Sequence, residues 1–128
     1  MKGRQDHASL IKETIDYFTR KNMQIYCADF PGYKKPIVVK RHAPDMICMD
    51  SETGMAYIVE VKLCSELNDE ITKEQFEDYP KRIMQNGKSA GKNMQFCIAV
   101  PEECKSKIQE TFRKWDIPWR DNIQVLGF

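Results

Sequence analysis

Hydrophobic residues recur along the chain with two different spacings, and these divide it into helices and strands. Spacing of three or four residues marks helices at 6–22, at 69–87 and after Pro101. Short apolar runs mark strands at 23–30, 45–50, 55–63, 93–100 and 122–128, with a shorter extended segment at 36–40. This order predicts one α/β domain over residues 1–128 with a mixed central sheet.

Local signals predict where the helices begin and end. Asp6 is the expected N-cap of the first helix, because its carboxylate can accept an otherwise unpaired backbone N–H. Gly87 is expected to end the second helix, and Pro80 predicts a kink in it or its division into two. The third helix is expected to turn one stripe to the core, formed by Cys104, Ile108, Thr111, Phe112 and Trp115.

The segments 45–50 and 55–63 predict a β-hairpin that is apolar on both faces. Gly54 suits the left-handed position in the turn "SETG", and folding about the midpoint between Glu52 and Thr53 fixes the register. One face then carries Ile47, Met49, Ala56 and Ile58, and the other carries Met46, Cys48, Tyr57, Val59 and Val61. A sheet buried on both sides needs helices over both faces, so the pattern predicts three layers.

Three charged residues interrupt this apolar hairpin. In the expected register Asp45 faces Glu60, and the alternation of side chains places Lys62 on the same side. Two opposed carboxylates destabilise a sheet, and a divalent cation removes that cost; magnesium favours oxygen ligands and commonly takes one or two carboxylates. A nearby lysine can orient a water or stabilise charge on a phosphoryl group. These residues predict a centre for Mg- or Mn-dependent phosphodiester hydrolysis. A one-residue slip at Gly54, or harmless charges at strand ends, are the alternatives.

The same residues form a recognisable motif. Pro44-Asp45, a variable gap and then Glu60-Val61-Lys62 resemble the signature of the PD-(D/E)xK nuclease superfamily. The resemblance implies a restriction-endonuclease-like three-layer fold and a magnesium-dependent deoxyribonuclease activity. It also implies Asp45 and Glu60 as metal ligands, the Val61 carbonyl as another ligand, and Lys62 as the catalytic lysine.

A second motif on the second predicted helix narrows the resemblance. Gln75 and Tyr79 are similar to the Q-x-x-x-Y element of RecB-type nucleases, and residues four apart share one helix face. In those nucleases the element contacts the active site and the DNA. The resemblance therefore implies that both side chains belong to the site, although Pro80 directly follows Tyr79.

Three residues are candidates for a further metal ligand. The segment from Gly3 to His7 resembles the G-x-x-x-H form of RecB-type nucleases, which implies His7. Holliday-junction resolvases place a glutamate on the first helix, where Glu13 is the nearest match. His42, three residues before Asp45, is the third alternative.

A basic segment follows the first predicted strand. "GYKKPIVVKRH" contains no acidic residue and has five candidate phosphate-binding side chains, namely Lys34, Lys35, Lys40, Arg41 and His42. We expect it to hold the DNA backbone without reading bases. An ordinary solvated loop is the alternative.

Composition limits the class of protein. With 128 residues, 41% hydrophobic and 30% charged, the chain is typical of a soluble globular domain, and no apolar run approaches the roughly 20 residues that span a membrane. The first ten residues lack the apolar centre of a signal peptide, which predicts a cytoplasmic location. A net charge of +1 says little about partners. So short a chain leaves little room for a recognition domain, so a homodimer or a helicase-type partner is expected.

The five cysteines are odd in number and form no C-x-x-C pair. Their spacing argues against a zinc site, an iron–sulfur cluster and a disulfide framework. Cys27, Cys48 and Cys97 lie in apolar runs and are expected to be buried reduced thiols.

A different class of function is also compatible with this sequence. The chain could be a catalytically silent module with a nuclease fold that binds DNA or a protein. The intact set of Asp45, Glu60 and Lys62 argues against that alternative.

Overall fold

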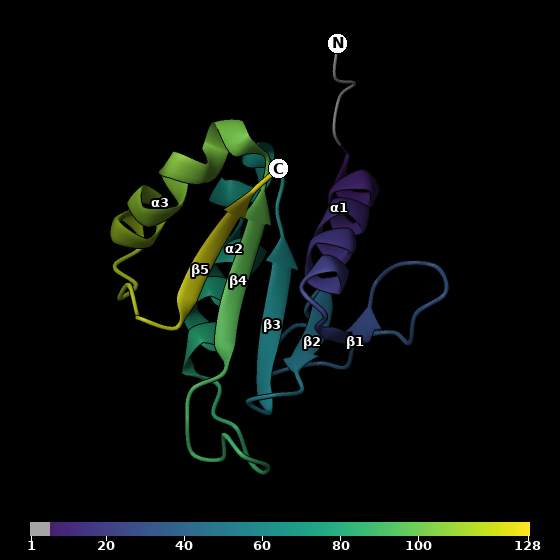
Figure 1. Ribbon diagram of the computed structural model, residues 1–128. Helices are drawn as coiled ribbons and strands as arrows, with labels where there is room; N and C mark the ends of the chain where they lie inside the picture. The colour runs from purple at the N-terminus through teal and green to yellow at the C-terminus, as the bar shows by residue number, and fades with distance from the viewer. Residues whose placement is uncertain (1–5) are drawn as a thin grey trace.

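The centre of the structure, a computed structural model that describes residues 6–128, is a five-stranded mixed sheet (Figure 1). Its strands are β1 (Gln24–Ala28), β2 (Met46–Asp50), β3 (Met55–Val61), β4 (Gln95–Val100) and β5 (Ile123–Gly127), in that spatial order. β1, β2 and β3 pair antiparallel, whereas β4 is parallel to β3 and β5 is parallel to β4. The predicted α/β class with a mixed sheet is confirmed; the more specific restriction-endonuclease-like fold stays a prediction.

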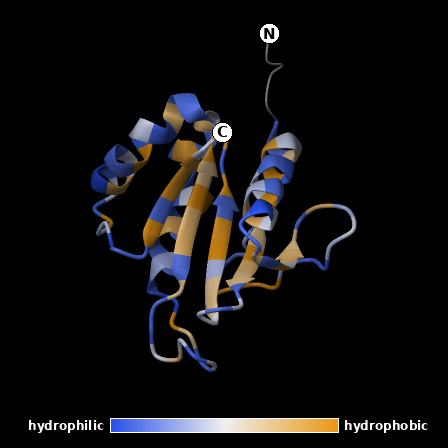
Figure 2. Cartoon of the chain, viewed as in Figure 1, coloured by the Kyte–Doolittle hydropathy of each residue, from blue (hydrophilic) through white to orange (hydrophobic). Residues whose placement is uncertain are grey.

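Helices cover both faces of the sheet. They are α1 (His7–Arg20), α2 (Glu70–Asp78) and α3 (Ile108–Lys114), with 3₁₀ turns η1 (Cys64–Asn68), η2 (Tyr79–Lys81) and η3 (Glu102–Lys107). Leu10 and Phe18 of α1 pack on one face with Val59, and Phe76 of α2 and Phe112 of α3 pack on the other. Figure 2 shows hydrophobic residues concentrated in the central strands between these layers. The expected three-layer arrangement is therefore present.

The ends of the first two helices follow local chemistry. Asp6 caps α1 as predicted, because its Oδ1 atom accepts the backbone N–H of Ser9 at 2.7 Å. The second helix ends at Asp78 and continues only as the 3₁₀ turn that contains Pro80, so its predicted division is confirmed. Its predicted extension to Gly87 is wrong, because proline removes a helical hydrogen bond and the chain becomes extended after η2.

Residues 36–40, expected to be a short strand or an extended approach, form no strand. Val39 makes a single antiparallel bridge with His42, and the rest of that stretch is irregular. An apolar run on an exposed loop has no neighbouring strand to supply a ladder of hydrogen bonds, so its β propensity is not realised.

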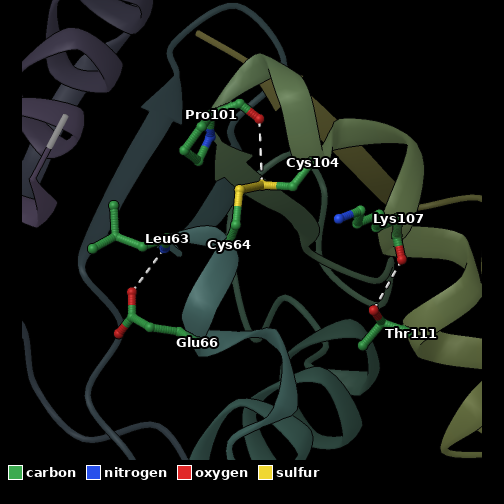
Figure 3. Close-up of a disulfide and its surroundings, with 7 residues drawn as sticks. All are labelled: Leu63, Cys64, Glu66, Pro101, Cys104, Lys107 and Thr111. Atoms are coloured by element: carbon green, nitrogen blue, oxygen red, sulfur yellow. Dashed lines mark hydrogen bonds between the residues drawn. A yellow bond between two sulfur atoms is a disulfide. The ribbon is translucent and has the colours of Figure 1, made fainter. Parts of the chain in front are cut away.

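A disulfide joins Cys64 to Cys104, which corrects the expectation that the cysteines form none (Figure 3). The two residues are 40 apart in sequence, but β3 and β4 are parallel neighbours and the turns after them meet at one edge of the sheet. Cys27, Cys48 and Cys97 are free and buried, as predicted. The cytoplasmic location stays a prediction. No helix within residues 6–128 has the length and apolar character to cross a bilayer.

Candidate active site

The hairpin of β2 and β3 brings the motif residues together in the register that the sequence predicts. Met46 of β2 pairs with Val59 of β3. The next facing positions of the hairpin are therefore Asp45 and Glu60. Gly54 adopts a left-handed conformation with a φ of 71° in the turn, and the predicted register passes through it without a slip. Both acidic side chains therefore lie on the face of the sheet that α2 and α3 cover.

Where the ladder between β2 and β3 ends, the two carboxylates accept hydrogen bonds from backbone N–H groups. The backbone N–H of Asp45 donates to Oε1 of Glu60 at 3.2 Å, and the N–H of Val61 donates to Oδ2 of Asp45 at 2.8 Å. The Nζ atom of Lys62 lies 3.7 Å from Oε2 of Glu60. The three charged groups of the motif thus converge, as predicted.

Burial sets the electrostatics of this group. Glu60 is only 1% exposed and Lys62 only 6%. Burial, reinforced by the charge of Asp45, raises the pKa of Glu60 well above its ordinary value. Burial also acts to raise the pKa of Asp45, but the neighbouring His7 and Glu60 side chains and the hydrogen bond from the Val61 N–H together lower it. The pair accommodates one negative charge readily, and a second only beside a compensating cation.

His7, the first residue of α1, lies against the same group. Its Nε2 atom is 3.0 Å from the carbonyl oxygen of Val61 and 3.6 Å from Oδ2 of Asp45. The neighbouring carboxylate of Asp45 is the largest cause that raises the pKa of His7 to about 8. Four predicted ligand groups, those of His7, Asp45, Glu60 and Val61, are therefore neighbours. Gly3, which begins the G-x-x-x-H motif, lies outside the described residues.

The other two candidates for a further ligand lie elsewhere. Nε2 of His42 is 2.8 Å from Oε1 of Glu74, so this imidazole is paired with α2 rather than with Asp45. Glu13 is half-buried on α1, about 9 Å along the helix axis from His7. The contacts of His7 with Asp45 and the Val61 carbonyl favour it.

Gln75 and Tyr79 are buried side by side at the C-terminal end of α2. Gln75 is 5% exposed and lies within hydrogen-bonding reach of the Tyr79 phenol, which donates to the carbonyl oxygen of His42 at 2.9 Å. Burial and the nearby charge of Glu60 raise the pKa of Tyr79, which places the phenol near the carboxylates. Oε1 of Gln75 has no hydrogen-bond partner within the described part of the chain. Pro80 leaves this geometry intact, because Tyr79 is itself the C-cap of α2.

Some side chains of the basic segment form ion pairs with α2, and others form none. The Arg41 guanidinium forms ion pairs at 3.0 Å with Glu74 and with Asp78, and His42 is paired with Glu74. Acidic residues of α2 already compensate Arg41 and His42, which makes them less available to phosphates, and their predicted phosphate binding stays a prediction. Lys34, Lys35 and Lys40 are exposed and form no ion pair with any residue of the range 6–128.

Glu66 is a residue near the site that the sequence analysis did not single out. Its Oε1 atom accepts the backbone N–H of Leu63 at 2.7 Å (Figure 3), and its charge contributes to the raised pKa of His7. No clear sequence signal marked it, because Leu63 at the N-cap lacks the hydroxyl that the usual S/T-x-x-E capping motif requires.

The oxygen donors at the end of the hairpin suit a hard cation. Within residues 6–128, no group of three or more His, Cys, Asp or Glu side chains is placed to hold a metal ion. The carboxylates of Asp45 and Glu60 and the Val61 carbonyl form a smaller set, of the kind that Mg²⁺ takes together with water and substrate phosphate. His7 competes for two of these groups while it is protonated, and its neutral Nε2 is itself a metal ligand.

Comparison with known proteins gives no relative to draw on. No protein-family model, no curated protein and no solved structure matches this chain.

Proposed function

We propose that this protein is a metal-dependent nuclease that hydrolyses DNA phosphodiester bonds at a PD-(D/E)xK-type centre. The observation that carries the proposal is the burial of Glu60 against Asp45 and Lys62 at the end of an apolar hairpin. Buried ionisable groups with strongly shifted pKa values concentrate at functional sites.

A purely structural role explains less of this arrangement. Asp45 and Glu60 each accept a backbone N–H where the strands separate. A neutral glutamine in place of Glu60 would accept the same N–H without burying a second carboxyl group beside the first. Facing carboxylates are costly as structure, and they are useful as ligands of a cation.

Each residue of the site has a separate role in the proposed hydrolysis. Asp45, Glu60 and the Val61 carbonyl would hold a Mg²⁺ or Mn²⁺ ion, whose chemistry is to polarise the phosphate and to acidify a bound water. Lys62 places a buried positive charge beside Glu60, where it stabilises the negative charge that develops on the phosphate or orients the attacking water. Gln75 offers an unpartnered acceptor near Tyr79 for a donor on water or substrate.

The test is DNA cleavage by wild-type protein and matched lysine variants. Supercoiled plasmid and single-stranded DNA are incubated with Mg²⁺ or Mn²⁺, and with EDTA as the metal-free control. Lys62→Ala should lose activity by about 100-fold or more, since a preorganised charge at a developing anion has that order of effect. Lys12→Ala, on the exposed ion pair with Asp16, should retain activity.

The obvious variant removes a buried charge, so its folding must be checked. Lys62→Met keeps the apolar length of the side chain, and circular dichroism compares each variant with the wild type. Undiminished cleavage by folded Lys62→Ala and Lys62→Met would remove Lys62 from the mechanism. Cleavage that persists in EDTA would exclude the metal-dependent mechanism.

One observation favours a second candidate, a DNA-binding or protein-binding module without catalysis. His7 engages Asp45 and the Val61 carbonyl, two of the three groups that a cation would need. Isothermal titration calorimetry separates the two functions: a module binds DNA and shows no Mg²⁺ binding, whereas the nuclease binds the ion with a dependence on Asp45 and Glu60.

A further inference from the structure

Strand β1 and the loop between β1 and β2 together expose aromatic and apolar side chains. Tyr26 is 60% exposed and Tyr33 is 40% exposed, while Ile37 and Val38 are 68% and 64% exposed. Figure 1 shows this loop reaching away from the sheet beyond β1. Tyr26 is the extra residue of a β-bulge in the pairing of β1 with β2, which turns its ring out of the sheet. We call Tyr26, Tyr33, Lys34 and Lys35 the loop surface.

Hydrogen bonds hold the loop surface close to the candidate active site. The backbone N–H of Ala28 donates to the carbonyl oxygen of Lys34 at 2.9 Å, which lays Lys34 along the outer edge of β1. The N–H of Asp29 donates to the carbonyl oxygen of Asp45 at 2.8 Å. Lys34 is therefore two strand spacings from β2, or about 10 Å. The ion pairs of Arg41 with α2 fix the other end of the loop.

The charge of this surface is positive and uncompensated. Lys34 and Lys35 have no carboxylate within ion-pair distance among residues 6–128, and the stretch 30–42 contains no acidic residue. The Nζ atom of Lys34 lies 5.9 Å from the centre of the Tyr26 ring. A complementary partner must be anionic and must also have flat apolar faces.

We propose that the loop surface binds single-stranded nucleic acid and leads it to the carboxylate pair. Tyrosine rings provide faces on which bases stack, and lysines bind the phosphates between them, which is how sequence-tolerant single-strand binding is built. A duplex keeps its base faces stacked inside, so it would use the lysines but not the rings. This inference rests on the proposed nuclease function for its purpose, and its test does not depend on cleavage.

The experiment is fluorescence anisotropy with labelled oligo(dT) of about 16 nucleotides, set against a duplex of equal length. Wild-type protein is used in EDTA, so that binding is measured without metal-dependent hydrolysis. Tyr26→Ala and Tyr33→Ala should each weaken oligo(dT) binding by about fivefold or more, while Tyr26→Phe, which keeps the ring, stays close to wild type. Lys34→Ala should lower the slope of log affinity against log salt by about 0.7.

Two matched controls lie on the opposite edge of the sheet. Trp119→Ala removes an aromatic side chain that is 40% exposed, and Lys105→Ala removes an exposed lysine. Both should bind oligo(dT) like the wild type. Unchanged oligo(dT) binding by folded tyrosine variants, or duplex binding as tight as single-strand binding, would overturn the inference.

The remaining outcomes separate this inference from the proposed function. If Tyr33→Ala abolishes self-association in sedimentation velocity and leaves oligo(dT) binding unchanged, the surface is a protein interface and the inference is wrong. Oligo(dT) binding that depends on Tyr26 and Tyr33 in a protein that cuts no DNA would support the inference and refute the nuclease. Cleavage that depends on Lys62, together with oligo(dT) binding that depends on neither tyrosine, would support the nuclease and refute the inference.

Discussion

Reduction of the Cys64–Cys104 disulfide should lower the free energy of unfolding substantially. The bond closes a loop between residues 40 apart, and it ties η1, which follows the strand that carries Glu60, to η3. The loop-closure entropy removed from the unfolded chain corresponds to about 4 kcal/mol at 25 °C for a loop of this size, and measured disulfides typically contribute 2–4 kcal/mol.

The expected change in melting temperature follows from the size of the chain. An unfolding entropy of about 2.1 cal/mol/K per residue gives about 0.27 kcal/mol/K for 128 residues. A loss of 2–4 kcal/mol therefore lowers Tm by about 7–15 °C. Differential scanning calorimetry with and without dithiothreitol measures this shift. The double variant Cys64→Ala/Cys104→Ala is the control, and its Tm should not respond to the reductant.

Thiol titration in denaturant tests the premise directly. Of the five cysteines, three should react in the unreduced protein, because Cys27, Cys48 and Cys97 are free, and five should react after reduction. Five reactive thiols before reduction, or a wild-type Tm that is the same with and without dithiothreitol, would refute the stabilising role of the disulfide.

Three further predictions concern single substitutions. Glu60→Gln removes a buried carboxyl group that faces Asp45, so in EDTA the Tm of this variant should exceed that of the wild type. Mg²⁺ should no longer raise the Tm of the variant. A thermal-shift assay in which the variant has a lower Tm than the wild type in EDTA would contradict this. Asn122→Ala should cost about 2 kcal/mol in urea unfolding, because the buried amide donates to two backbone carbonyls at 2.8 Å that would be left unpaired. Gly54→Ala should cost about 1 kcal/mol in the same assay, since the turn holds a φ of 71° that alanine disfavours, and Gly54→Asn should recover part of the loss.

The hairpin was predictable because its constraints are local. The position of Gly54 and the strict alternation of side chains fix which residues face each other, and that register brings Asp45 and Glu60 together. The capping role of Asp6 depends on a hydrogen bond to a residue three positions away, so it too could be predicted from the sequence.

The missed features depend on contacts between distant parts of the chain. Cys64 and Cys104 meet only because β3 and β4 are parallel neighbours, and nothing in their spacing indicates it. Arg41 is compensated by acids 33 and 37 residues away, so composition alone made it look available for phosphates. The burial of Lys62 likewise results from the packed layers and not from its neighbours in sequence.

The most direct test of the nuclease centre is a crystal structure grown with Mn²⁺ and measured at the manganese absorption edge. The proposed function predicts one anomalous peak bounded by the carboxylates of Asp45 and Glu60 and by the Val61 carbonyl, and loss of that peak in Glu60→Gln. An anomalous map with no manganese peak beside these oxygens at saturating Mn²⁺, and with His7 still hydrogen-bonded to the Val61 carbonyl, would contradict the proposed function.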